Sequence, residues 1–486
     1  MKPIVFVDNS KNYYLYSVYK NQIINIDRKL YDLITEYLNN PKTFVSNYFF
    51  KDRDEELNYV FKRFDYLNKN GFFKIDNPYT VNGRLFAEDI EMALSNLKVI
   101  TFELTQKCNL KCTYCVYREM YDSSAPNESV DLSFGIAKAV IDFFYKQFNS
   151  NAAASINRSV SIGFYGGEPL LRFDLLKQIL CYSKDLNTQN FSFHYNITTN
   201  GLLLDKYMDF LVENNVTLLV SLDGDLSTSK YRLTRNNSDS FPVVFRNLVQ
   251  LKDNYPEYFK KNVSFNAVFH NRSDILKILT FFKINFDVIP IFSELTSVSL
   301  KREYQGVYKS MFQSVNRAVQ LNKDLISPVI HHKINPILPQ TFKFVEGCGG
   351  SHYRGYRHLL TGDMKMNHIP TASCTPFANK LFVSADGKFH PCEKVGHDYP
   401  LGYIDENFNV KIDYKSILDR YNGYYDRIAQ KCIKCYRVNS CTTCLFQRDL
   451  DCQPINREEM TQYLKNSINS IRRNKSILNL HKNSIQ

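Results

Sequence analysis

Between Val99 and about residue 320, the chain alternates short apolar segments with amphipathic helical segments. Such alternation is typical of parallel strands, each followed by a helix that returns over the sheet in a right-handed crossover. The predicted strands are 99–104, 160–164, 193–198, 216–222 and 263–269, and the predicted helices include 133–148, 174–187 and 205–214. About six such units predict an α/β fold with a partial (β/α)6 TIM-like barrel rather than a closed eight-stranded barrel.

Residues 1–75 are predicted to form a small separate domain. Three strand-like segments, 4–7, 13–18 and 23–26, are separated by polar turn sequences. Asp27 is placed to cap a helix, and a second amphipathic helix follows it. The apolar positions of these helices recur at helical spacing: Leu30, Leu33, Ile34, Leu38, Leu57, Phe61, Phe64 and Leu67. Three strands with two such helices predict a winged-helix-like domain.

The chain has 12 cysteines, and their use depends on the compartment. No apolar run reaches the roughly 18 residues needed to span a bilayer, and the first ten residues lack the apolar region of a signal peptide. These features predict a cytoplasmic protein with no membrane partner, in which cysteines stay reduced and bind metal or act in catalysis. Cys181 stands alone in a helical segment and is predicted to be a buried apolar residue.

The formal net charge is +12, but 49 acidic residues are mixed among the 61 basic ones. The sequence has no zinc-finger pairing of Cys with His and no ribonucleoprotein motif, so a nucleic-acid partner is not expected. The basic balance indicates either an ordinary solvated surface or an acidic partner such as a peptide leader.

The first cysteine motif, Cys108-x3-Cys112-x2-Cys115, directly follows the first predicted barrel strand. Three thiolates can bind three irons of a four-iron cluster and leave one iron open, whereas electron-transfer clusters take four cysteines. A zinc loop is the alternative. The motif resembles that of the radical S-adenosylmethionine (SAM) superfamily. The resemblance implies a 4Fe-4S cluster whose open iron binds SAM, a 5′-deoxyadenosyl radical, and a place near the adenine for Tyr114.

A second resemblance to this superfamily is the segment Gly166, Gly167, Glu168, Pro169 at the end of the next predicted strand. Two glycines let a backbone approach a ligand closely, and a carboxylate can accept hydrogen bonds from an ammonium group. The resemblance implies that these four residues bind SAM, with Glu168 facing the methionine amine. In most proteins the same sequence would form an ordinary turn.

Polar residues near two later strand ends are further candidates for binding SAM. Asn200 and Ser221 have short side chains suited to the ribose hydroxyls or the cofactor carboxylate, and so does Asp223. Arg232 is predicted to face the cofactor carboxylate or the substrate, with a surface arginine as the alternative. Taken alone, such segments are mostly helix caps and turns.

Residues 345–455 are cysteine-dense with little helix signal, and such a segment is predicted to fold around metal. The cysteine spacing resembles the SPASM domain, which extends radical SAM enzymes that modify peptides, although one spacing is a residue shorter than the family pattern. The resemblance implies two auxiliary 4Fe-4S clusters, which makes three clusters in all. One would be held by Cys432, Cys435, Cys441 and Cys452, and the other by Cys374, Cys392, Cys444 and, as a fourth ligand, Cys348. Structural zinc is the alternative.

Glu393 directly follows Cys392. In the sulfatase-activating relatives of this family an acidic residue at this position accepts a proton from the substrate. The resemblance implies the same catalytic role for Glu393. A solvated structural glutamate is the alternative.

The predicted domains follow from these features. They are a winged-helix-like peptide-recognition domain at 1–75, a linker at 76–97, a radical SAM partial barrel at 98–320, a bridging region at 321–344, a SPASM domain at 345–455 and a helical tail at 456–486.

This layout resembles radical SAM enzymes that mature ribosomal peptides. The resemblance implies a precursor peptide whose leader adds as a strand along 13–18 and 23–26, beside the helix at 30–38. It also implies hydrogen abstraction, a thioether or carbon–carbon crosslink, and a reductant such as flavodoxin or ferredoxin. Two alternatives are an anaerobic sulfatase-maturing enzyme that makes formylglycine and a non-catalytic zinc-bearing protein that binds peptide or nucleic acid.

Overall fold

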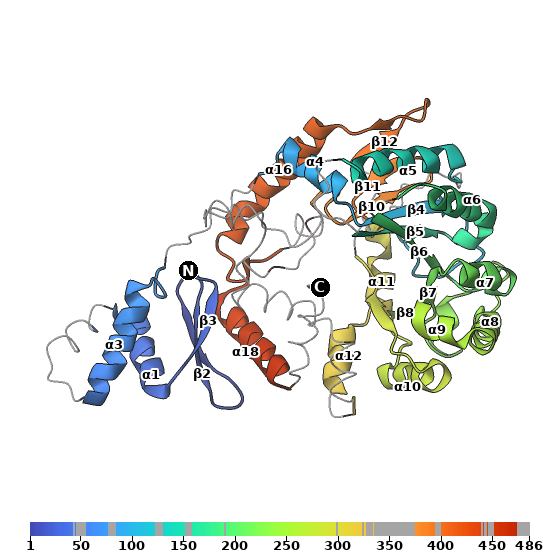
Figure 1. The fold of residues 1–486 in the computed structure, drawn as a ribbon. Helices are drawn as coiled ribbons and strands as arrows, with labels where there is room; N and C mark the ends of the chain where they lie inside the picture. Colours follow the sequence, from blue (N-terminus) through green and yellow to red (C-terminus); the bar gives the residue numbers. More distant parts are fainter. Residues whose placement is uncertain are drawn as a thin grey trace. The chain divides into compact units, whose positions relative to one another are not determined.

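The computed structural model describes residues 1–41, 44, 55–75, 84–121, 130–150, 158–188, 191–297, 300–322, 325–326, 334, 375–393, 400–438, 441, 445 and 452–473. The chain divides into two compact units (Figure 1). The small unit comprises Met1–Arg84, Pro336–Ser373 and Arg420–Gln486, and the barrel unit comprises Leu85–Asn335 and Cys374–Asp419. Residues of the predicted 345–455 domain therefore fall in both units.

The small unit contains an antiparallel sheet in the order β1 (Ile4–Val7), β2 (Tyr13–Ser17) and β3 (Gln22–Ile26). Two helices follow it, α1 (Arg28–Asn39) and α3 (Glu55–Lys69). The predicted cap is confirmed, because the carboxylate of Asp27 accepts a hydrogen bond of 2.8 Å from the backbone N–H of Leu30. These strands and helices lie where the sequence predicted them, and the winged-helix assignment stays a prediction.

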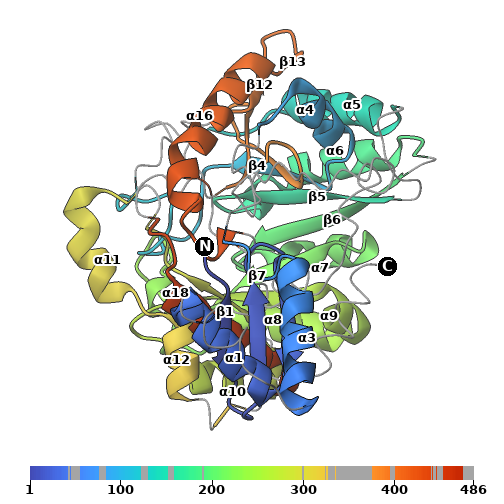
Figure 2. The same ribbon diagram turned by 90° about the vertical axis from the view of Figure 1, so that its left-hand side faces the viewer.

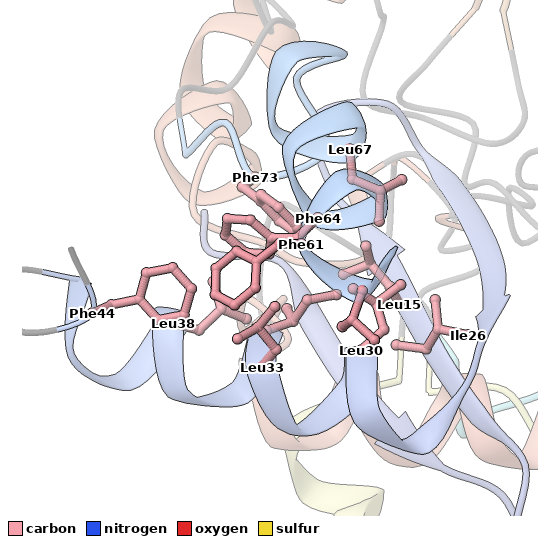
Figure 3. Packing of buried hydrophobic residues seen from close by; sticks show 12 residues of the cluster. Leu15, Ile26, Leu30, Leu33, Leu38, Phe44, Phe61, Phe64, Leu67 and Phe73 are labelled. Carbon is pink, nitrogen blue, oxygen red and sulfur yellow. The ribbon is translucent and has the colours of Figure 1, made fainter. Parts of the chain in front are cut away.

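Both faces of this sheet are covered. Helices α1 and α3 pack on one face, where Leu15, Leu30, Phe61 and Phe64 belong to one buried cluster (Figure 3). The other face packs against α18 (Arg457–Arg473), and its buried cluster contains Ile4, Phe6, Tyr14, Tyr16, Met460, Leu464 and Ile468. The alternation of side chains along β2 sends Tyr14 and Tyr16 to α18, and Tyr13 and Leu15 to the opposite face.

The barrel unit contains six parallel strands in the order β4-β5-β6-β7-β8-β9. They are β4 (Val99–Thr105), β5 (Arg158–Gly166), β6 (Phe191–Thr199), β7 (Thr217–Ser221), β8 (Val263–Phe269) and β9 (Ile291–Glu294). The predicted parallel α/β sheet is confirmed. The last strand, β9, was not among the segments that the sequence predicted.

Helices follow the strands of this sheet, with α5 and α6 beside β4–β6 and α7–α9 beside β7 and β8 (Figure 2). The helices of the barrel unit are α4 (Ala87–Ser95), α5 (Phe134–Phe148), α6 (Phe173–Lys184), α7 (Leu204–Glu213), α8 (Phe241–Asn254), α9 (Pro256–Asn262), α10 (Ile275–Phe286), α11 (Gln305–Met311) and α12 (Val315–Leu321). None of the helices in the described ranges is both long and apolar enough to cross a membrane.

Four further strands extend the barrel sheet beyond β4. They are β10 (Lys380–Val383), β11 (Lys388–His390), β12 (Gly402–Ile404) and β13 (Val410–Lys411). β10 pairs in parallel with β4, and the next three strands add antiparallel, which gives a sheet of ten strands. This part of the predicted cysteine-rich domain is thus a continuation of the barrel sheet.

The sequence indicated little helix in 345–455. This expectation is wrong for α16 (Tyr414–Cys432), which has 19 residues. Its buried side chains lie on one face, and half of them are tyrosines: Ile417, Tyr421, Tyr424, Tyr425, Ile428 and Cys432. Tyrosine is a weaker helix former than leucine or alanine, so the apolar period is less visible in the sequence.

Candidate active site at the ends of the barrel strands

The candidate site gathers at the carboxyl ends of the parallel barrel strands, where α/β folds place their binding loops. Cys108, Cys112 and Cys115 lie in the loop that follows β4 and are all partly buried. Burial, followed by smaller effects of neighbouring groups that include Cys115, raises the pKa of Cys108 to about 11 and that of Cys112 to about 12. The three thiols therefore lie close enough to repel one another once ionised.

This loop suits a cationic group of several irons. Buried thiolates that repel one another need a bound cation to be stable. Three cysteine thiols in one loop are the donor set of a four-iron cluster that keeps one iron open, so these residues fit such a cluster.

A segment after β7 holds the backbone of the cysteine loop. The N–H of Lys111 donates to the carbonyl of Leu233 at 2.7 Å, and the N–H of Thr113 donates to the carbonyl of Tyr231 at 3.1 Å. The Nε of Arg235 donates to the carbonyl of Cys108 at 2.8 Å. These bonds fix the loop from one side.

The glycines of the Gly166–Pro169 segment lie against the backbone that leads into Cys108. Gly166 has a φ of +132°, and a Cβ there would lie 2.2 Å from the carbonyl oxygen of Thr105. A Cβ on Gly167 would lie 2.1 Å from the carbonyl oxygen of Lys107. The backbone N–H groups of Gly167 and Glu168 donate to those same two carbonyls at 2.8 and 2.9 Å. The close approach is thus to the segment that leads into Cys108, and SAM binding by Gly166, Gly167, Glu168 and Pro169 stays a prediction.

Glu168 is fully buried, and three internal donors reach its carboxylate. One oxygen accepts from the N–H of Leu170 at 3.1 Å and the hydroxyl of Thr199 at 2.8 Å, and the other accepts from the N–H of Asn200 at 2.8 Å. Burial raises its pKa to about 7 despite these hydrogen bonds. The hydrogen bonds of Glu168 join the end of β5 to the end of β6, while Pro169 begins a short 3-10 helix.

A buried charged cluster lies at the ends of β7 and β8. Arg232, only 6% exposed, donates to the fully buried Asp223 at 2.9 Å. The hydroxyl of Tyr114 also donates to Asp223, and the Arg232 guanidinium lies over the Tyr114 ring at 5.6 Å. Although burial alone would raise it, Arg232 and these hydrogen bonds hold the pKa of Asp223 below its usual value. Arg232 is therefore not the surface arginine that the sequence left as an alternative.

His270 completes this cluster and was missed by the sequence analysis. It is fully buried, its ring stacks on Tyr114 at 5.8 Å, and its Nε2 lies 3.8 Å from a carboxylate oxygen of Asp223. Its position directly after a predicted strand is the signal that could have identified it. Ser221, at the end of β7, is half-buried.

Glu393 belongs to a second polar group in the barrel unit. Its carboxylate accepts a hydrogen bond from Lys380 at 2.5 Å. The negative charges of Glu393, Cys115, Glu103 and Cys392 each add to the rise in the pKa of Tyr165 that burial causes. Burial is the main reason that the pKa of Tyr165 is raised. The structure therefore brings Glu393 and Cys392 near the first cysteine loop, and Tyr165 was missed by the sequence analysis.

Glu103 also belongs to this second group, and hydrogen bonds hold its carboxylate in place. It is fully buried on β4, accepts from the hydroxyl of Tyr117 at 2.7 Å and accepts from the backbone N–H of Ala385 at 2.9 Å. These bonds tie β4 and the cysteine loop to the turn after β10. Neither Glu103 nor Tyr117 was singled out from the sequence.

The remaining cysteines divide between the units. Four of them line one pocket in the small unit: Cys432, Cys435, Cys441 and Cys452. Cys348, Cys374 and Cys444 lie outside the described residues. The prediction for Cys181 is wrong, because it is exposed on α6, whose buried face is formed by other residues such as Leu180.

Comparisons with known proteins identify a family for the part of the chain that contains this site. Residues 102–282 match the Radical SAM superfamily. The chain is 25% identical over 331 residues to a cysteine-type anaerobic sulfatase-maturating enzyme of Clostridium novyi. The aligned residues make up 64% of this chain and 78% of that protein. It is 26% identical over 260 residues to the radical SAM cyclopropyl synthase TigE of Paramaledivibacter caminithermalis, which covers 51% of each. The solved structure of anSMEcpe with bound AdoMet and Kp18Cys peptide matches 80% of this chain and 99% of that one, with a TM-score of 0.51 and 18% identity, which indicates a shared fold.

Proposed function

Because residues 102–282 are a radical SAM domain and the protein is an enzyme of that superfamily, we propose that it modifies a precursor peptide by hydrogen abstraction. The product would be a thioether or carbon–carbon crosslink. The cytoplasm would be its site of action, and a flavodoxin or ferredoxin its reductant.

When bound, a 4Fe-4S cluster and SAM would supply a one-electron bond cleavage that yields a hydrogen-abstracting radical. Cys108, Cys112 and Cys115 would hold the cluster. Ser221, Asp223 and Arg232 would contact SAM, beside Tyr114. The loop is held by backbone hydrogen bonds and Asp223 by its ion pair with Arg232, and both would help to hold this site in a defined geometry.

The auxiliary cysteines would hold two further clusters. One set is Cys432, Cys435, Cys441 and Cys452, which line a common pocket. The other set is Cys348, Cys374, Cys392 and Cys444, of which Cys392 is described. Glu393, next to that last set, would accept a proton from the substrate.

The observation that carries the peptide proposal is a pocket of about 640 Å³ between β3 and α3. β3 lies at the edge of the three-stranded sheet, and an edge strand can pair with an extended peptide. Ile24 and Phe72 give the pocket an apolar floor, and Lys20 and Lys62 give it positive charge suited to an acidic leader. The lining helix is α3, whereas the sequence predicted the helix at 30–38.

Tyr66 provides the test of this groove. It lines the pocket and is 65% exposed, whereas Tyr59, on the same helix and 62% exposed, does not line the pocket. We expect Tyr66→Ala to weaken binding of a fluorescent synthetic leader by roughly tenfold or more, because exposed tyrosines are frequent anchors of interfaces. Fluorescence anisotropy would measure the dissociation constant, and Tyr59→Ala should leave it unchanged. Equal losses in the two variants would contradict a groove between β3 and α3.

A sulfatase-maturing enzyme is the second candidate, and the match to the Clostridium novyi enzyme across 64% of this chain favours it. Co-expression with each substrate followed by mass spectrometry separates the two. A precursor peptide short of two hydrogens for each crosslink supports the first proposal, and a sulfatase peptide whose cysteine has become an aldehyde supports the second. The non-catalytic zinc-protein alternative is wrong, since the protein is a radical SAM enzyme.

A further inference from the structure

The side chain of Asn200, directly after β6, reaches the first cysteine of the loop. Its Nδ2 lies 2.7 Å from Oδ1 of Asn109 and 3.7 Å from Sγ of Cys108. A primary amide carries two hydrogens, so one N–H can serve each acceptor. The backbone N–H of Leu110 is a second donor to the same sulfur, at 3.4 Å.

The orientation of this amide is fixed by its own partners. Oδ1 of Asn200 accepts from the backbone N–H of Leu202 at 3.0 Å, so the nitrogen must point to the cysteine loop. The backbone N–H of Asn200 donates to Glu168, whose other oxygen is held by Thr199. Asn200 is only 7% exposed. A buried and fully bonded amide keeps its donor aimed at Cys108.

We propose that Asn200 is a positioning residue that donates a hydrogen bond to the cluster thiolate of Cys108 and thereby makes the cluster easier to reduce. Glu168 would act through Asn200, by holding its backbone. The inference rests on the proposed function, in that Cys108 must be a cluster ligand. The physical reason is that an added electron increases the negative charge on the thiolate sulfurs, so an N–H···S bond stabilises the reduced cluster more than the oxidised one.

The test compares Asn200→Leu with Asn109→Leu in the full-length, reconstituted protein. Leucine has a similar size to asparagine but no donor. Asn200→Leu should shift the midpoint potential to a more negative value, so that the ratio of reduced to oxidised cluster at a fixed potential falls by roughly three- to tenfold, as expected for one lost hydrogen bond. Asn109→Leu removes the neighbouring acceptor but leaves the donor to Cys108, and should keep the wild-type potential. A redox titration followed by electron paramagnetic resonance would measure both.

Three results would overturn the inference. One is an unchanged potential in Asn200→Leu with weakened SAM binding, which would make Asn200 a cofactor contact. Another is an equal shift in both variants, which would indicate a general disturbance of the loop. The third is a wild-type protein with iron bound at the other cysteines but no paramagnetic signal from this cluster, which would overturn the proposed function as well.

A measurement on the wild-type protein covers the case in which Asn200→Leu does not fold. Asparagine labelled with ¹⁵N only in the side-chain amide would be incorporated, and the reduced cluster examined by pulsed electron paramagnetic resonance. A weak ¹⁵N coupling is expected, since the amide nitrogen is 3.7 Å from the Cys108 sulfur. Absence of any such coupling would refute the hydrogen bond.

Discussion

Replacing Gly167 by alanine is expected to prevent cluster assembly. The new Cβ would lie 2.1 Å from the carbonyl oxygen of Lys107, and that residue immediately precedes Cys108. Backbone cannot move aside as a flexible side chain can, so the alanine must displace the entry to the cysteine loop. Overpacking of about 3 kcal/mol, at the upper end of the usual range, would accompany this shift. Iron content after anaerobic reconstitution should fall by about one third of the wild-type value, because two of the three proposed clusters are held by other cysteines.

Gly306→Ala is the matched control for Gly167→Ala. Gly306 lies in α11, and a Cβ there would meet no atom within 4 Å. Its iron content should equal that of the wild type, and its thermal midpoint should be unchanged or slightly higher, since alanine favours helix. Gly167→Ala should melt lower by roughly 5 °C, as expected for a loss of about 3 kcal/mol in a unit of about 300 residues. Wild-type melting and iron content in Gly167→Ala would contradict the close approach of the two segments.

Replacing Glu393 by glutamine is expected to stop product formation while SAM cleavage continues. Glutamine keeps the shape of the side chain but cannot accept a proton as a carboxylate does. Loss of a general base lowers the rate by about 100-fold or more. Mass spectrometry of the peptide product, set against the yield of 5′-deoxyadenosine, would separate the two steps.

Lys380→Met distinguishes a catalytic role for Glu393 from a structural one. Lys380 donates to Glu393 at 2.5 Å, so either substitution breaks this ion pair. If the pair only holds β10 in place, both variants should lose activity equally. If Glu393 accepts the proton, Glu393→Gln should lose far more product than Lys380→Met. A Glu393→Gln protein with the wild-type product rate would rule out the catalytic role.

Most of the fold could be predicted because its elements carry a local period. The strands of the small unit and β4–β8 were found from short apolar runs, and Asp27 was identified as a cap from its position before a helical pattern. β9 was missed because Ile291–Glu294 has four residues, none of them buried, and is defined by its pairing with β8. Long-range pairing of this kind leaves no period in one strand.

The site was predictable in its parts but not in its contacts. The cysteine motif and the Gly166–Pro169 segment were recognised in the sequence. Nothing local shows that Gly167 meets Lys107, since the two lie in different strand-end loops. The same holds for Cys108, which follows β4, and Asn200, which follows β6. The two meet only because both strands pair in parallel with β5 between them. His270 was missed because its one signal is its position directly after the predicted strand 263–269, and no motif of neighbouring residues accompanies it.

The sheet of the small unit also sets an order of events during synthesis. Its strands emerge from the ribosome first, but α18, which covers the face formed by Tyr14 and Tyr16, is made only after the whole barrel unit. At roughly 5–20 residues per second, that face waits for a time on the order of tens of seconds. A nascent chain therefore carries an uncovered aromatic surface throughout translation of the barrel, where chaperones can bind it before α18 closes over it.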